Sequence, residues 1–283
     1  MFERFSRSWS LVKASAGVLA QDKELLVFPL VASVASLVVA AGFVLPMVGL
    51  GAFDGLDRVA EGDADPLLIG WAFCFYVAQY FVMFFFQSAL VGAAMIRLQG
   101  GDPTVGDGFR IAFSRLGPIL GYAVIAATVG MLLRALQERA GAIGRWVGGL
   151  LGVAWTVATY MVVPILVTRE VGPLEAVQES ARLLKRSWGE NVIGQGGIGL
   201  VFGLLQFMLI LIGALFIAGS AASQSTGLLV VAIAGTVVAV ILVALVQTAL
   251  SGIYAAALYR HATGAPAAPG FDQGLLAGAF APK

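Results

Sequence analysis

The first residues that could carry chemistry form a glycine-rich string. Residues 194–199, GQGGIG, match the G-x-G-x-x-G pattern of dinucleotide-binding sites letter for letter. Such a site needs a preceding strand, a following helix and an acidic residue about 20 positions later. Here the string opens an apolar span, and the next acidic residue is Asp272. We therefore expect no nucleotide cofactor and favour helix packing through these small residues.

Acid–base, nucleophilic and metal chemistry lack a recognisable set of residues. The chain has one histidine, His261, and one cysteine, Cys74, so disulfides and histidine or cysteine clusters are excluded. The serines within or beside the spans, Ser88, Ser220 and Ser251, have no histidine or lysine partner at a recognisable spacing. None of the six spans named below has an Asp, Glu, Lys or Arg in its interior, which disfavours a proton-coupled transporter. We expect a protein that is not an enzyme and that holds no metal or cofactor.

Amide and hydroxyl side chains recur at helical spacing within three apolar spans. These polar stripes comprise Gln79 and Gln87, then Gln195 and Gln206, and finally Gln247, Ser251 and Tyr254. In one interpretation the side chains bond across helices, each such bond contributing ~0.6–2 kcal/mol. In the other, the stripes face one another around a hydrated pocket or lipid groove. We favour the first interpretation, because amides in helix bundles mostly hold helices together.

A group of basic residues stands beside a tryptophan in a short amphipathic segment. Arg182, Lys185 and Arg186 precede Trp188. Each Lys or Arg near an anionic membrane surface contributes about 1 kcal/mol of binding, so these residues are candidates for contact with lipid headgroups. The same residues would also anchor the topology, and the two roles are compatible.

Composition defines the elements that must position these residues. The chain is 59% hydrophobic and only 12% charged, whereas soluble domains carry roughly 25% charged residues. The class is therefore an integral membrane protein, all-α and polytopic, and no basic patch for nucleic acid exists. Each span is near or above the ~20 residues that cross a bilayer. The expected spans are 25–50, 67–96, 116–136, 143–168, 192–219 and 227–258.

Three short amphipathic helices alternate with pairs of spans. They begin near residues 2, 104 and 173, and their apolar stripes suit helices that lie in the membrane interface. With both termini in the cytoplasm, 13 of the 17 Lys and Arg lie inside, as the positive-inside rule requires. We expect one six-span domain over 1–261, built from units near 2–96, 104–168 and 173–258. Residues 262–283 form a tail rich in Pro, Gly and Ala.

A family resemblance accompanies this pattern. It rests on the strings VVPILVTREVGPLEAVQESARLLKRSWGENVIG, SWSLVK and YAAALYRHATG. They resemble a family of uncharacterised six-span prokaryotic membrane proteins, and the plan is loosely similar to the membrane domain attached to some glycerophosphodiester phosphodiesterases. The resemblance implies a fold and a place in the prokaryotic cytoplasmic membrane, without an activity. We expect a module that engages membrane lipids or a membrane protein partner. The alternative is a transporter or channel for a small or amphipathic solute.

Overall fold

The computed structural model describes residues 13–49, 66–139, 141–188, 197–223 and 225–266. Helices fill these ranges, which contain no strand, so the predicted all-α class is confirmed. After a helical stretch at 13–21, the elements are η1 (Lys23–Leu26), α2 (Val27–Gly49), α4 (Pro66–Leu98), α5 (Val105–Ser114), α6 (Leu116–Arg139), α7 (Gly141–Ala158), α8 (Val162–Thr168), α9 (Pro173–Trp188), α10 (Gly197–Ala222) and α11 (Thr226–Ala262).

Six stretches are long and apolar enough to cross a membrane, which confirms the predicted number of spans. Their ends lie within a few residues of the predicted ones, apart from the start of the fifth, whose first predicted residues lie outside the described part of the chain. The observed stretches are Lys23–Gly49, Pro66–Leu98, Leu116–Glu138, Gly144–Thr168, Val201–Ala222 and Thr226–Ala262.

The chain divides into two compact units, each of which is described by itself. Unit 1 comprises Met1–Leu26, Ala94–Asp102 and Trp188–Lys283, and unit 2 comprises Val27–Ala93 and Pro103–Ser187. Unit 2 therefore holds four of the long helices, α2, α4, α6 and α7, together with α5, α8 and α9. Unit 1 holds the hairpin of α10 and α11 together with residues from the N-terminal part of the chain and the end of α4.

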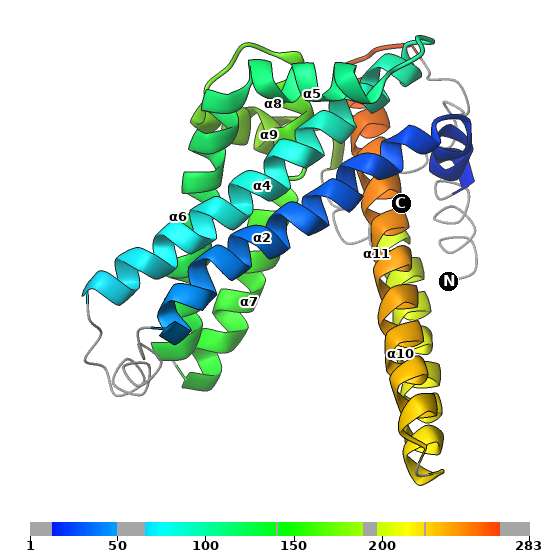
Figure 1. Cartoon of the computed structure of the whole chain (residues 1–283). Coiled ribbons are helices and arrows are strands. Elements are labelled where there is room, and N and C mark those ends of the chain that lie inside the picture. Colours follow the sequence, from blue (N-terminus) through cyan, green and yellow to red (C-terminus); the bar gives the residue numbers. More distant parts are fainter. Residues whose placement is uncertain (1–12, 50–65, 140, 189–196, 224, 267–283) are drawn as a thin grey trace. The chain divides into compact units, whose positions relative to one another are not determined.

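In unit 2 the short helices α5, α8 and α9 lie at one end of the bundle of long helices (Figure 1). The amphipathic helix α5 starts next to residue 104, as predicted, and begins with a capping box. Thr104 Oγ1 accepts from Asp107 N at 3.2 Å, while the Asp107 carboxylate accepts from Thr104 N at 3.0 Å. These reciprocal bonds satisfy backbone donors that a helix start leaves free.

The buried side of α5 packs through a cluster of phenylalanine rings. The centroid of Phe109 lies 5.4 Å from that of Phe28 on α2 and 5.9 Å from that of Phe86 on α4. The outer member, Phe113, meets Phe85 at 5.0 Å but stays 59% exposed. The cluster fixes α5 to the bundle and leaves one large apolar side chain at its rim.

In unit 1, α10 and α11 run side by side as an antiparallel hairpin (Figure 1). A β-carbon at Gly213 of α10 would lie 2.2 Å from Thr236 Cγ2 of α11, so the Thr236 side chain packs directly against α10 because residue 213 is glycine. With 37 residues, α11 is about 55 Å long, more than the ~30 Å of a hydrocarbon core. Its last third, Ala249 to Tyr259, is almost entirely buried in protein.

Candidate functional site

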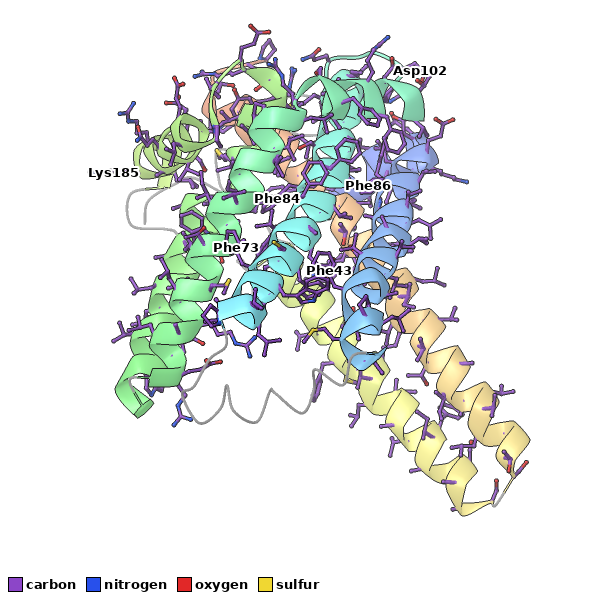
Figure 2. All side chains as sticks on the ribbon, turned by 60° about the vertical axis from the view of Figure 1, so that its left-hand side comes forward. Phe43, Phe73, Phe84, Phe86, Asp102 and Lys185 are labelled. Atoms are coloured by element: carbon purple, nitrogen blue, oxygen red, sulfur yellow. The ribbon has the colours of Figure 1, made fainter. Side chains whose placement is uncertain are left out.

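The candidate headgroup site is the outer face of α9. The helix begins at Pro173, which suits a first helical position because the missing N–H has no partner there. Its buried side is formed by Ala176, Ser180, Leu183 and Leu184. Arg182 and Lys185 lie on the exposed side, and Figure 2 shows Lys185 on the outer side of α9. The predicted contacts Arg186 and Trp188 belong to the same helix, but their side chains lie outside the described residues.

The first leucine of α9, Leu174, lies outside the buried side of the helix. Leu174 is 64% exposed, whereas Ala176 and Ser180 are fully buried. The helix thus packs through its small residues, whose size permits a close approach to the bundle, and Leu174 is turned outward. Close packing also occurs at Pro173, since a β-carbon at Gly121 of α6 would lie 2.7 Å from Pro173 Cγ.

The basic side chains at this end of unit 2 differ in whether they form an ion pair. Arg110 pairs with Asp107, Arg115 Nη1 lies 3.7 Å from Glu170 Oε1, and Arg169 Nη1 lies 3.2 Å from Glu179 Oε1. By contrast, Arg182 and Lys185 have no carboxylate partner among the described residues. These two charges are therefore available to an external anion.

Large apolar side chains are exposed at the same end of the unit. Leu174 on α9, Phe113 on α5 and Leu116 at the start of α6 are 64%, 59% and 39% exposed. An amphipathic helix in the membrane interface presents such residues to the acyl region and its basic residues to the headgroups. The combination of free cations and exposed apolar side chains suits that setting.

Sequence reasoning missed a break in the fourth span beneath α9. Between α7 and α8, residues 159–161 leave the helix. Pro164 lacks the N–H that would bond to the carbonyl of residue 160, and its ring crowds that carbonyl. Within this break Tyr160 N donates to the carbonyl of Val157, which is the acceptor that a regular helix would offer to Met161 N. The Met161 N–H donates to Ser180 Oγ of α9 at 3.1 Å. Pro164, near the end of the predicted span, was the available signal in the sequence.

Two adjacent residues of α9 thus bond to both residues that flank α8. Met161 is the N-cap of α8 and Arg169 is its C-cap. Ser180 accepts from the backbone of the first, and Glu179 accepts from the guanidinium of the second. The seven-residue helix α8 is therefore held at both ends by the helix that carries the candidate site.

The structure places the polar stripes in both units. In unit 2, Gln79 Nε2 donates to Ser36 O of α2 at 3.0 Å, and Gln87 is half-buried. In unit 1, Gln206 Nε2 donates to Val240 O of α11 at 3.4 Å. The remaining members of unit 1 are Gln247 and Ser251, which are half-buried, and Tyr254, which is buried; Gln195 lies outside the described residues.

Two of these glutamines thus join neighbouring helices, as the first interpretation of the stripes expects. One polar atom stays unsatisfied, because Gln206 Oε1 is buried without a hydrogen-bond partner among the described residues. The string at 194–199 lies partly outside the described residues, and its last three residues begin α10.

Most of the chain matches one protein family. No curated protein matches the chain. The family model DUF6159, described as a family of unknown function, matches residues 68–268, a range that includes α9, the last four spans and all but the first two residues of the second span. This confirms the resemblance to an uncharacterised family. The chain belongs to the family DUF6159.

Proposed function

We propose that this multi-pass membrane protein is a non-enzymatic module that binds anionic lipid headgroups through α9. The observation that carries the proposal is the pair Arg182 and Lys185, exposed and without a carboxylate partner among the described residues, on a helix whose Glu179 already pairs with Arg169. Membrane lipids are then the partners, with a membrane protein partner as a further candidate and no role for nucleic acid.

The size of the expected binding free energy favours a lipid headgroup over a soluble anion as the ligand. Each cation near an anionic surface contributes about 1 kcal/mol, which is too little to hold a dilute ion. A lipid headgroup is already confined to the interface, and Leu174 adds apolar contact. Full burial of a leucine side chain contributes about 1.5–3 kcal/mol, so the exposed Leu174 and Phe113 strengthen the attachment of this end of unit 2 to the bilayer surface.

We propose that the protein lies in the prokaryotic cytoplasmic membrane with both termini in the cytoplasm. In that orientation α5 and α9 meet the leaflet whose anionic lipids attract basic segments. The distribution of Lys and Arg along the sequence supports the orientation.

The test uses the full-length protein in nanodiscs that contain equal amounts of a zwitterionic and an anionic phospholipid. Native mass spectrometry counts the lipids that leave the nanodisc with the protein. Preferential retention of the anionic lipid supports the proposal. Retention in proportion to the nanodisc composition would contradict it.

A transporter or channel for a small or amphipathic solute is the second candidate. Gln206 Oε1, which is buried and has no hydrogen-bond partner in the described part of the chain, favours it, because an unsatisfied acceptor in a span is costly unless water or a solute reaches it. Solute flux into proteoliposomes that falls on Gln206→Leu or Gln247→Leu substitution would support transport. Flux equal to that of protein-free liposomes would remove this candidate.

A further inference from the structure

We infer that lipid binding at α9 controls the break in the fourth span, with Ser180 as the residue that couples the two. This inference rests on the proposed function and assigns a regulatory consequence to the same site. Its physical basis is that one helix carries both the free cations and the bonds that hold α8.

The cations that would contact a headgroup and the serine that bonds to Met161 lie on different sides of α9. Arg182 follows Ser180 by two residues, which is about 200° around a helix. The exposed cation therefore points away from the bundle, while Ser180 is fully buried against Met161. Because Arg182 and Ser180 lie on the same helix, a headgroup that shifts α9 against the bundle also changes the distance from Ser180 Oγ to Met161 N.

The bond from Met161 N to Ser180 Oγ takes the place of a side-chain cap at the start of α8. The N-cap residue of α8, Met161, makes no side-chain capping bond of its own. Pro164 removes a further backbone donor from the first turn of α8. Within a bilayer a freed backbone group must find a protein partner, and for the Met161 N–H that partner is Ser180. Without the bond, the short helix α8 loses its connection to α9 at this end.

The Arg169–Glu179 ion pair supports the same coupling from the other end of α8. Its nitrogen and oxygen are 3.2 Å apart, and the side chains are 46% and 27% exposed. Being partly exposed, this pair is weaker than the buried bond of Ser180. A lipid that binds only when α9 packs against the bundle favours the conformer in which both bonds are formed, Ser180 to Met161 and Glu179 to Arg169.

The experiment is hydrogen–deuterium exchange of full-length protein in two nanodiscs, one purely zwitterionic and one half anionic. We expect the anionic lipid to slow amide exchange in peptides that cover residues 159–163. Ser180→Ala should abolish this lipid-dependent slowing and Ser180→Thr, which keeps the hydroxyl, should retain it. Should Ser180→Ala fail to fold, Glu179→Gln provides the second test through the other link. Gln178→Ala, at an exposed position of the same helix, is the matched control and should behave like the wild type.

The two experiments distinguish a failure of the coupling from a failure of lipid binding. If native mass spectrometry shows retained anionic lipid but exchange at 159–163 is the same in both nanodiscs, or if Ser180→Ala keeps the slowing, the coupling is wrong and headgroup binding stands. If no anionic lipid is retained, the proposed function fails and the coupling fails with it.

Discussion

Phe28 Cζ occupies the space that a side chain at Gly108 would need: a β-carbon at 108 would lie 2.4 Å from it and 2.7 Å from the carbonyl oxygen of Ala89. The second contact is with backbone, so rotation of the Phe28 ring alone cannot relieve the clash. The close seating of α5 on α2 and α4 therefore requires glycine at this position.

Gly108→Ala should lift α5 from the bundle and destabilise the protein by about 1–3 kcal/mol, the usual cost of overpacking. Thermal unfolding in detergent micelles measures the loss. Gly106→Ala is the control within the same helix, because its β-carbon would meet only Thr104 Oγ1 at 3.6 Å. Equal melting temperatures for the two variants would contradict the account of α5 packing.

The α10–α11 hairpin makes a similar prediction for Gly213. Its added β-carbon would lie 2.2 Å from Thr236 Cγ2 and 3.1 Å from Thr236 Cβ. Rotation about χ1 of the threonine moves the first atom but leaves the tight contact with the second. Gly213→Ala should lower the melting temperature, and Thr236→Ala in the same chain should restore part of the loss. Gly219→Ala should be neutral, because none of the described residues has an atom within 4 Å of its β-carbon. A similar loss at both glycines would argue against close helix approach at 213.

Arg97 bonds to two aspartates that differ in burial. In unit 1 it forms a two-bond pair with Asp22 and a further bond to Asp102. The Asp22 side chain is 8% exposed and that of Asp102 is 92% exposed. Loss of a buried charged hydrogen bond costs about 1.5–3 kcal/mol, whereas exposed ion pairs contribute about 0–1 kcal/mol.

Asp22→Asn should therefore release residues 13–26 from the end of α4, and Asp102→Asn should not. Amide exchange of residues 13–26 in the full-length protein measures the difference. Faster exchange in both variants, or in neither, would show that burial does not decide the strength of the two pairs.

The capping carboxylate of α5 gives a pH dependence with a defined sign. The Thr104 hydroxyl and backbone N–H, followed by the charge of Arg110, hold the pKa of Asp107 below its ordinary value of 3.8. A lowered folded pKa contributes stability that is fully present above the unfolded pKa and lost as the pH falls through the folded one. Protection of the first turn of α5 should thus be constant above about pH 5 and decline below about pH 4.

Exchange of residues 104–108, corrected for the intrinsic pH dependence of exchange, measures this protection. Asp107→Asn should remove the decline at low pH, because an amide does not titrate. A decline that persists in Asp107→Asn would assign it to another group.

The fold was largely predictable from sequence because span length and the cap at Thr104 are local signals. The contact of Ser180 with Met161 was not, since it joins residues 19 positions apart and depends on how α9 packs on the bundle. Leu174 fits the same apolar stripe as Leu184 by spacing alone, yet packing through Ala176 and Ser180 leaves it exposed. The cations Arg182 and Lys185 were identified by type, but only the structure separates them from the paired Arg169.

Anionic lipid affinity of charge variants tests the central claim most directly. Native mass spectrometry in detergent, with added anionic phospholipid, gives the dissociation constant of the first bound lipid. At about 1 kcal/mol for each cation, Arg182→Ala/Lys185→Ala should weaken binding roughly 30-fold. The exchange Arg182→Lys/Lys185→Arg should preserve it. Arg139→Ala/Arg145→Ala, which removes the same charge at the opposite end of unit 2, should leave it unchanged. Equal weakening by both alanine pairs, or by neither, would contradict headgroup binding at α9.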